Sequence, residues 1–503
     1  MHRLAQLDRQ FVWHPFTQMR DWLRREPLVI VSGRDAVVRD VHGREYLDAN
    51  SSIWTNLHGH NHAKINAAIQ RQLRKIAHSS ALGLANAPAS LLAEKLVESA
   101  NEICDLRVAI YDSTRKSARK SAIANRKLSK VFFSDDGSTA LEVALKLAYE
   151  FTRRTRSANN LSAAKKSTEP KFLSLEGAYH GDTVGAVALG HIDLFHRDYS
   201  GLLFKTDKVM SPYCYRCPFN RAKPERADAR AYRRCNWECI GKIEQKFFAQ
   251  KKKGNPYAAF VFEPLIQGAV GMIPQPTGWL QRAAEIARGY GALLIADEVM
   301  TGFGRTGFPS PLNSQPSTSL FACHQECVQP DFLCLAKGMT GGYLPMAATL
   351  TTQKIFSAFL GEYAEFKTFF HGHSYTANQL GAAASLASLD ILRSAESVRD
   401  RVRLEKTLHD ELQPLWSQPN VGDIRQVGLI VGIELVKDWR TRRPFDLCAR
   451  AGIRVCEAMA KRGVLTRPIG NVVVLLPPYC TTAAQVKKIV TALGDGIAAA
   501  LGN

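Results

Sequence analysis

A regular alternation of short apolar runs with amphipathic stretches constrains the fold of this chain most. The candidate buried strands are residues 171–175, 258–263, 292–296 and 331–336. Residues 139–151 and 279–290 have the apolar spacing of helices that bury one face. Strands that alternate with helices form a mostly parallel sheet, and ligands bind at the carboxyl ends of its strands. We therefore expect an α/β fold with its site at that edge.

The two ends of the chain follow other patterns. Residues 33–48 alternate apolar and polar side chains, which predicts a β-hairpin. From about residue 381 the pattern changes to long helices with two strands, 428–434 and 472–476. A chain of 503 residues is long enough for more than one hydrophobic core, so this change predicts a second domain.

The positive charge is concentrated in a few places. Lys and Arg number 66 against 46 Asp and Glu, a formal net charge of +20. Segments 106–130, 152–171 and 219–253 hold almost all of this excess. The first two mix Ser, Ala and basic residues, which predicts loops that include 112–122 and 153–168. We interpret all three as solvated surface insertions. Binding of RNA or an acidic partner is the alternative. Apart from Tyr111, no aromatic residue interleaves with the basic residues of the first two segments as a stacking platform requires, so we do not favour a nucleic-acid partner.

Composition and the N-terminal residues indicate a folded cytoplasmic protein. Hydrophobic residues make up 46% of the chain and charged residues 22%, which excludes a disordered chain. No apolar stretch approaches the roughly 20 residues that span a bilayer, so we expect no membrane association. The first 19 residues carry charges throughout and lack the apolar core of a signal peptide. The 11 cysteines are odd in number and scattered, which favours thiols over disulfides.

One group of cysteines stands apart from the others. Cys214 and Cys217 form one close pair, and Cys235 and Cys239 form a second. The spacing resembles that of a zinc ribbon, so one interpretation is a structural zinc ion that holds a small basic loop together. Four free thiols in a basic loop is the other interpretation, and we favour it.

Three polar sites follow or precede the predicted core elements. Asp297 comes directly after the strand at 292–296, and Lys337 directly after the strand at 331–336. Gly137 and Ser138 lie at the start of the helix at 139–151. A partly desolvated lysine can form a Schiff base, a carboxylate can hold a pyridinium N–H, and free N–H groups at a helix start suit a phosphate. Aldehyde, ring nitrogen and phosphate are the three handles of pyridoxal 5′-phosphate.

The sequence around these residues carries a family resemblance. Asp297-Glu-Val-Met-Thr-Gly-Phe-Gly-Arg-Thr-Gly307, followed by Leu335-Ala-Lys337-Gly-Met-Thr-Gly-Gly342, resembles the signature of the class III aminotransferases. These are pyridoxal phosphate enzymes of fold type I. Further segments are similar to the members of this family that act in biotin biosynthesis. These are residues 13–19, 51–54, 58–60, 177–183, 371–376 and 466–468.

The resemblance implies a domain arrangement and an assembly. We expect a large domain over 62–380 with a mostly parallel seven-stranded sheet, interrupted by basic insertions near 106–130, 152–171 and 214–253. Residues 1–61 and 381–503 would together form a smaller α+β domain. The family resemblance also implies a homodimer with shared active sites and small-molecule substrates.

The resemblance also implies catalytic roles for three residues. Lys337 would form the Schiff base with the cofactor and move a proton during transamination. Asp297 would pair with the pyridinium nitrogen. Tyr179 would stack on the cofactor ring and face the substrate.

The remaining expected contacts surround the phosphate and the substrate. Gly137 and Ser138 would hold the phosphate, and Ser374 from the partner subunit would complete its site with His373 beside it. Arg467 would pair with a substrate carboxylate, which suits a bidentate guanidinium. The expected substrate-binding residues are Ile53, Trp54, Tyr179, Asp182, Gly372 and Arg467.

The reaction that the resemblance implies is amino transfer to 8-amino-7-oxononanoate, from either S-adenosylmethionine or lysine. Some relatives carry Tyr where this chain has Phe16, and Trp where it has Ile53. The Tyr hydroxyl contacts S-adenosylmethionine in such relatives, so Phe16 leaves the donor open. Ala377 replaces a usual Gly, which would cost about 1 kcal/mol or less if its φ is positive. Two alternatives remain: another class III ω-aminotransferase, and a basic nucleic-acid-binding protein with a degenerate enzyme core.

Overall fold

The computed structural model describes residues 1–102, 126–159, 169–307 and 319–502. The first predicted basic loop, 112–122, and residues 160–168 of the second lie outside these residues. Within them, seven strands form a central sheet. In spatial order they are β4 (Leu128–Ser134), β12 (Ala347–Thr352), β11 (Phe332–Leu335), β10 (Leu293–Asp297), β7 (Tyr257–Phe262), β5 (Lys171–Leu175) and β6 (Asp207–Val209).

One strand of this sheet runs against the others. β12 pairs antiparallel with both β4 and β11, whereas the pairs from β11 through β10, β7 and β5 to β6 are parallel. All six residues of β7 are buried, as expected of a parallel strand covered on both faces. The predicted α/β fold with a mostly parallel seven-stranded sheet is therefore confirmed.

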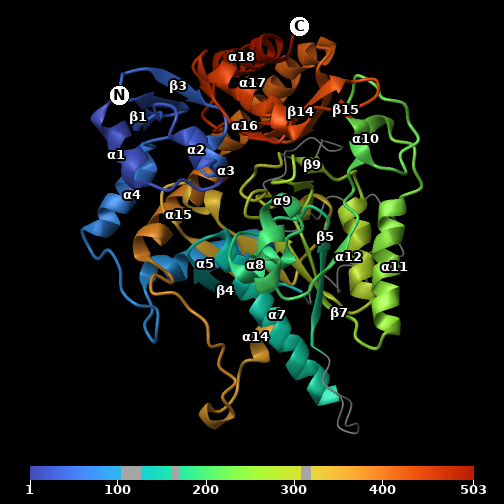
Figure 1. Ribbon diagram of the computed structural model, residues 1–503. Helices are drawn as coiled ribbons and strands as arrows, with labels where there is room; N and C mark the ends of the chain where they lie inside the picture. Colours follow the sequence, from blue (N-terminus) through green and yellow to red (C-terminus); the bar gives the residue numbers. More distant parts are fainter. Residues whose placement is uncertain (103–125, 160–168, 308–318, 503) are drawn as a thin grey trace.

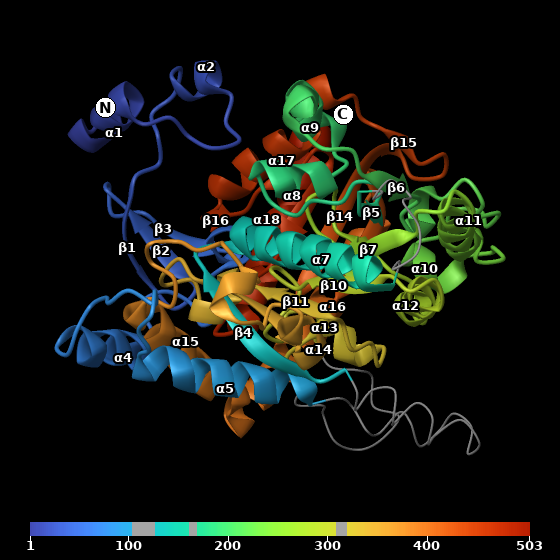
Figure 2. The ribbon, with the colours of Figure 1, turned by 90° about the horizontal axis from the view of Figure 1, so that it is seen from below.

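Helices cover both faces of the sheet (Figures 1 and 2). Leu141, Ala144 and Ala148 of α7 pack on the face that carries Phe332. Leu96 of α5 and other apolar residues of α5 and α12 belong to the main core on the opposite face. The helices of this part of the chain are α4 (Ala63–Leu73), α5 (Ala87–Asn101), α7 (Gly137–Asn159), α8 (Val184–Leu189), α9 (Asp193–His196), α10 (Ala229–Tyr232), α11 (Glu238–Lys252), α12 (Trp279–Gly289), α13 (Ala322–Gln325) and α14 (Gln353–Ser357).

Segments from the two ends of the chain share a sheet. The predicted hairpin forms as β2 and β3, and β16 from the C-terminal region pairs parallel with β3. The strands are β1 (Ile30–Arg34), β2 (Val37–Asp40), β3 (Glu45–Asp48) and β16 (Val464–Leu465). Nearby N-terminal helices are α1 (Arg3–Phe11), α2 (Met19–Trp22) and α3 (Ser51–Trp54). This pairing brings the N-terminal segment against the C-terminal third of the chain (Figure 1).

The C-terminal third forms a further sheet with helices packed on it. Its strands are β13 (Val421–Val427), β14 (Ile430–Asp438), β18 (Val472–Leu475) and β17 (Pro468–Ile469), with β15 (Arg443–Pro444) paired to β14. The helices are α15 (Gln379–Arg393), α16 (Ala395–Leu412), α17 (Ala451–Ala460) and α18 (Ala483–Leu501). A two-stranded ribbon, β8 (Ile266–Gln267) and β9 (Ile273–Pro274), lies between this region and the central sheet. No helix of the described residues is both long and apolar enough to cross a membrane.

The prediction of a loop from residue 153 was wrong for its first part. α7 continues to Asn159 because its basic residues have partners along the helix surface. Arg154 donates to the carboxylate of Glu150 one turn earlier and to the carbonyl of Ala358. Its guanidinium also lies 4.5 Å from the ring centroid of Phe359. Arg154 is therefore part of the packed helix and does not belong to a solvated insertion.

The prediction that the third basic segment is an insertion loop was also wrong in part. Residues 238–252 form α11, which buries Cys239, Ile243 and Phe247 at intervals of four residues. Phe247 contacts Tyr257 of β7 edge-on and stacks with Tyr290 after α12. The apolar stripe fixes the helix against the sheet, and the many lysines lie on its other side.

Candidate active site

The two residues singled out at strand ends lie next to each other in space. β10 and β11 are adjacent and parallel, with Asp297 in register with Cys334, three residues before Lys337. Lys337 begins a short 3-10 helix, Lys337–Thr340, directly after β11. Because parallel strands end at one edge of the sheet, both side chains reach the same edge.

Asp297 is buried and fixed by two hydrogen bonds. Its Oδ2 lies 2.8 Å from Nδ1 of His180, and its Oδ1 accepts the N–H of Val299 at 3.1 Å. Among the described residues, Nε2 of His180 has no hydrogen-bond partner. His180 is therefore a hydrogen-bonding partner of the Asp297 carboxylate.

The amine of Lys337 has a lowered pKa and lies against an aromatic ring. Burial lowers its pKa, and the nearby carboxylate of Asp297 opposes part of that effect. Nζ lies 4.6 Å from the ring centroid of Trp54. The backbone of Lys337 has φ +44°, a left-handed conformation that non-glycine residues adopt at a cost. A lowered pKa increases the fraction of neutral amine, which is the nucleophilic form.

Trp54 reaches the lysine from a strained segment. Residues 51–54 all have positive φ, between 45° and 83°. The indole N–H of Trp54 donates to Oδ1 of Asn50 at 2.9 Å. A Cβ atom on Gly268 would lie only 2.7 Å from the sulfur of Met300 and 3.4 Å from the Trp54 ring, so the turn at Gly268 packs closely on this wall. The structure thus places Trp54 at the lysine, as its predicted substrate-binding role requires.

Gly137 and Ser138 begin α7 in a crowded corner. A Cβ on Gly137 would lie 2.7 Å from Val299, and a Cβ on Gly181 would lie 2.1 Å from the hydroxyl of Ser138. That hydroxyl also accepts the backbone N–H of Asp182 at 3.2 Å. The first N–H groups of a helix have no partner within it, so this corner offers donors to an anion.

Tyr179 and Asp182 form a hydrogen-bonded pair. The Tyr179 hydroxyl donates to Oδ2 of Asp182 at 2.7 Å. Burial and this carboxylate raise the pKa of Tyr179, so its hydroxyl stays protonated. Phe195 contacts the ring of Tyr179 edge-on at 6.4 Å between centroids, and Phe16 contacts Phe195 at 5.3 Å. An aromatic chain therefore joins the N-terminal segment to Tyr179.

Glu263 is a site residue that the sequence interpretation missed. It follows β7 at the same edge as Asp297 and accepts the N–H groups of Gly268, at 2.8 Å, and Tyr179, at 3.4 Å. Burial raises its pKa to about 7, with His180 opposing and Asp297 adding to the effect. Its place at the end of a predicted buried strand was the signal that could have found it.

A cavity of about 510 Å³ lies against the N-terminal sheet and reaches residues 50–53, the segment that carries Trp54. Ile53 and Arg467, both predicted to bind substrate, line it together with Thr466. Asp48, which also lines it, is paired with His60 at 3.0 Å. No ion pair joins Arg467 to a carboxylate of the described residues, so its guanidinium is available to a ligand carboxylate.

Segment 371–376 is not brought to Lys337 within the chain. Gly372 and Ser374 are exposed, and the carbonyl of Ser374 is 3.0 Å from Nε2 of His78. His373 lies closer to the phosphate corner, with Nδ1 3.6 Å from Oδ2 of Asp135. Ala377 has φ +59°, which meets the condition under which its replacement of a glycine carries a cost.

Two of the four clustered cysteines, Cys214 and Cys239, are buried, and Cys217 and Cys235 are half-buried. Burial raises the pKa of Cys214 to about 12 and that of Cys239 to about 11, with Cys217 and Cys235 close enough to contribute. All four are free. Over the described residues, no group of three or more His, Cys, Asp and Glu side chains is placed to hold a metal ion. The geometry therefore gives no support to the structural-zinc interpretation.

Comparisons with known proteins find relatives over nearly the whole chain. Residues 20–497 match the sequence profile of the family described as aminotransferase class-III. The adenosylmethionine-8-amino-7-oxononanoate aminotransferase of Nitratidesulfovibrio vulgaris is 43% identical over 500 residues, 99% of this chain and 82% of that protein. The protein of the same name from Geobacter sulfurreducens is 42% identical over 494 residues, 98% of this chain and 97% of that one.

Solved structures show the same fold. The crystal structure of adenosylmethionine-8-amino-7-oxononanoate aminotransferase from Methanocaldococcus jannaschii has a TM-score of 0.82 and 36% identity, and 99% of each chain is covered. A PLP-bound amine transaminase from an uncultivated Pseudomonas species has a TM-score of 0.81 and 31% identity, covering 97% of this chain and 99% of that one. This chain belongs to the class-III aminotransferases.

Proposed function

We propose that this transaminase converts 8-amino-7-oxononanoate to 7,8-diaminononanoate with pyridoxal 5′-phosphate as cofactor. The observation that carries the proposal is the placement of Lys337 and Asp297 at adjacent strand ends, beside the start of α7. The substrate follows from relatives at 43% and 42% identity that bear this activity in their names. The alternative of a basic nucleic-acid-binding protein with a degenerate core has no such support, because the match to the class-III aminotransferases covers residues 20–497.

The residues of the site fit the three handles of the cofactor. Lys337 supplies the amine for the aldehyde, Asp297 the carboxylate for the ring nitrogen, and the start of α7 the donors for the phosphate. The close packing at Gly137 and Gly181 keeps side chains out of the phosphate corner. When bound, pyridoxal phosphate supplies an electron sink for the carbon that loses a proton.

The residues of this chain then carry the proton and orient the substrate. Lys337 acts as base and acid in turn, and its lowered pKa increases the fraction of neutral amine that can accept a proton. His180 keeps Asp297 oriented toward the ring nitrogen through the 2.8 Å contact. Trp54 and Tyr179 provide walls that exclude water from the lysine. Arg467, across the cavity, pairs with the carboxylate of 8-amino-7-oxononanoate.

The amino donor is proposed to be S-adenosylmethionine, which the names of the relatives include. Lysine is the second candidate, because Phe16 offers a ring without a hydroxyl where the aromatic chain reaches Tyr179 through Phe195. A bleaching experiment that adds each donor alone to the protein distinguishes them.

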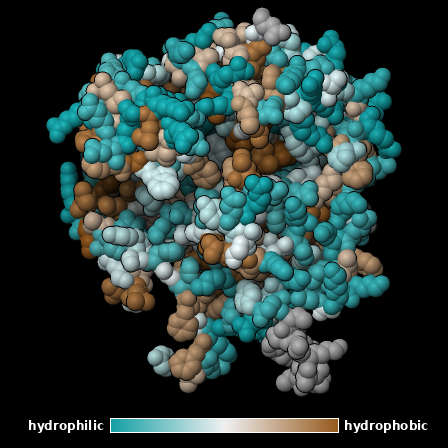
Figure 3. All heavy atoms as spheres, viewed as in Figure 1, coloured by the Kyte–Doolittle hydropathy of each residue, from teal (hydrophilic) through white to brown (hydrophobic). Residues whose placement is uncertain are grey.

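We further propose a homodimer in which segment 371–376 of each chain completes the site of its partner. Apolar side chains are exposed on the N-terminal segment and on the segment after α14, both visible as brown atoms in Figure 3. Trp13 is 87% exposed and Phe370 73%, values that a partner surface would lower. We take residues 62–380 as the large domain, and 1–61 with 381–503 as the small one.

Borohydride reduction tests the proposal at its central residue. Reduction of the protein loaded with pyridoxal phosphate should fix the cofactor on the peptide that contains Lys337, as peptide mass mapping would show. Lys337→Ala should give no labelled peptide and no visible absorbance band. Lys354→Ala, at an exposed lysine of α14, is the matched control and should label normally. Labelling at another lysine in the wild-type protein would refute the assignment.

A further inference from the structure

A second cavity lies outside the active site, between the turn at Cys214–Arg216 and the β14–β15 hairpin. Its volume is about 780 Å³, within the range of about 300–1,000 Å³ that holds small ligands. β15, which contributes to its lining, lies near α10 and away from the N-terminal strands and the segment after α14 (Figure 1). The described side chains that line it include four basic ones and one acidic one. These are Arg216, Lys437, Arg442, Arg443 and Asp438.

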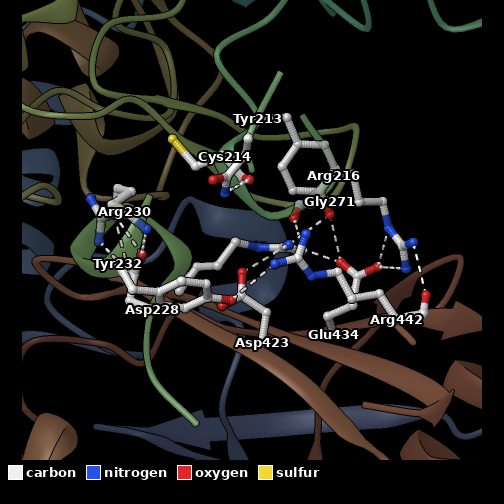
Figure 4. Close-up of polar contacts among 12 residues, drawn as sticks. Tyr213, Cys214, Arg216, Asp228, Arg230, Tyr232, Gly271, Asp423, Glu434 and Arg442 are labelled. Atoms are coloured by element: carbon white, nitrogen blue, oxygen red, sulfur yellow. Dashed lines mark hydrogen bonds and ion pairs between the residues drawn. The ribbon is translucent and has the colours of Figure 1, made fainter. Parts of the chain in front are cut away.

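The buried acid beneath this cavity is already shared between two guanidiniums. Glu434 pairs with Arg216 at 2.5 Å and with Arg425 at 2.8 Å, as Figure 4 shows for the Arg216 side. The second acid of this network, Asp423, lies 3.5 Å from Arg425. The neighbouring Asp228 forms an ion pair with Arg230 at 2.7 Å. None of these carboxylates neutralises the other basic residues of the cavity.

Asp438, the acid in the cavity wall, is engaged within its own hairpin. It accepts the hydroxyl of Thr441 at 2.8 Å and the backbone N–H of Arg440 at 3.0 Å. These two hydrogen bonds lower the pKa of Asp438, so its carboxylate is ionised and already accepts hydrogen bonds from its own hairpin. Across the described parts of the chain, Lys437, Arg442 and Arg443 form no ion pair with a carboxylate.

The fold also holds two of the guanidiniums together. Arg216 and Arg442 lie 5.2 Å and 5.1 Å from the centroid of the same buried ring, that of Tyr215. Nη1 of Arg216 donates to the carbonyl of Arg442 at 3.1 Å, a contact drawn in Figure 4. Both side chains therefore contact one ring at the wall of the cavity. The charge of Arg216 is paired with Glu434, whereas no carboxylate of the described residues pairs with Arg442, which leaves its charge available to an anion.

We propose that this cavity is a binding site for a small anion that carries a phosphate or pyrophosphate group. The planar guanidiniums of Arg442 and Arg443 can each donate two hydrogen bonds to phosphate oxygens. Lys437 adds a third positive charge. The hydroxyl of Thr441 lies in the same wall. The volume of about 780 Å³ exceeds what a single phosphate needs, so the cavity also admits a pyrophosphate group. The site is separate from the proposed transamination and does not depend on it.

Calorimetric titration of the holoenzyme with inorganic pyrophosphate tests the site. The loaded cofactor occupies the phosphate corner of the active site, and its absorbance band reports whether it stays there. We expect saturable binding of one pyrophosphate per chain with no change in that band. Arg442→Gln combined with Arg443→Gln should weaken binding at least tenfold.

The matched control removes the same charge elsewhere. Arg440→Gln with Lys461→Gln lowers the net charge equally; Arg440 is on the same hairpin, but neither residue lines the cavity. This control should bind as the wild type does. If the double variant of the cavity does not fold, Lys437→Gln, at an exposed side chain, should still weaken binding severalfold.

Three results would overturn the proposal. The first is no saturable binding by the wild-type holoenzyme. The second is equal weakening in the cavity variant and the control, which would indicate diffuse charge attraction. The third is binding that bleaches the cofactor band, because the pyrophosphate would then occupy the active site.

Discussion

Oδ2 of Asp297 lies 2.8 Å from Nδ1 of His180, with both side chains buried at the carboxyl edge of the central sheet. This contact connects the strand end at β10 to the segment that carries Tyr179 and Asp182. A carboxylate that must hold a ring nitrogen needs one orientation, and the imidazole supplies it together with the N–H of Val299.

His180→Ala should therefore slow transamination without abolishing cofactor binding. Loss of a hydrogen bond to a charged group costs about 1.5–3 kcal/mol, which corresponds to roughly a 10- to 100-fold fall in kcat/KM. Steady-state kinetics with the loaded enzyme would measure it. His42→Ala, at an exposed histidine, is the control. Unchanged kcat/KM in His180→Ala would contradict the positioning role.

Arg467→Ala should raise the KM for 8-amino-7-oxononanoate far more than it lowers kcat. The guanidinium pairs with a carboxylate that is remote from the reacting carbon, so its loss removes binding of substrate and transition state alike. A charge-assisted pair of this kind accounts for roughly 10- to 100-fold in KM. Arg454→Ala, an exposed arginine of α17, should leave KM unchanged. An equal effect of both variants would argue against a carboxylate site at Arg467.

Ala377→Gly should stabilise the protein slightly. Ala377 has φ +59°, where a Cβ is unfavourable and glycine is not. The free energy of unfolding should rise by about 1 kcal/mol or less, measured by denaturant titration. Ala358→Gly, at a helix C-cap with φ −70°, should instead lower it by a similar amount. A loss of stability in Ala377→Gly would show that packing of the methyl group outweighs the backbone strain.

His58 should make stability depend on pH on the acid side. Burial, followed by the nearby charges of His62, Arg401 and Arg305, lowers its pKa to about 3. The folded state keeps this imidazole neutral while the unfolded chain takes up a proton below about pH 6.5. The stability contribution is therefore complete above pH 6.5 and is lost as the pH falls toward 3.

His58→Gln should flatten that dependence. The wild type should lose about 2 kcal/mol more than the variant between pH 6.5 and 5, as linkage of one proton requires. The readout is the slope of the unfolding free energy against pH, from denaturant titrations at several pH values. The variant also alters the contact with Ser388, which changes the free energy itself, so absolute values are not compared. His42→Gln corrects for the loss of an exposed imidazole. Parallel curves for wild type and His58→Gln would contradict the buried neutral state.

Strand ends made the cofactor site predictable from sequence. Asp297 and Lys337 each follow an unbroken apolar run, and the order of strands then brings them together. Glu263 follows a run of the same kind, but a glutamate held by backbone N–H groups has no recognisable partner in sequence. The position of segment 371–376 could not be predicted from spacing alone, since its contacts cross to another part of the chain.

The basic composition of α7 and α11 led to the wrong prediction of loops at the end of α7 and over α11. The lysines of α11 hid the apolar spacing of Ile243 and Phe247. In α7, Arg154 also donates to the carbonyl of Ala358, which lies 204 residues away in the sequence. Charge runs are usually solvated, but here tertiary contacts with carbonyl groups and rings satisfy part of the charge. The cavity beside Tyr215 shows the same effect, because its basic residues come from two distant segments.

The most direct test of the account is turnover of 8-amino-7-oxononanoate by the purified protein loaded with pyridoxal phosphate. S-adenosylmethionine or lysine, added alone, should bleach the cofactor band, and 8-amino-7-oxononanoate should then restore it while 7,8-diaminononanoate appears by mass spectrometry. Lys337→Ala should do neither. A protein that binds the cofactor on Lys337 but forms no 7,8-diaminononanoate with either donor, while it transaminates another amine and keto acid, would contradict the account.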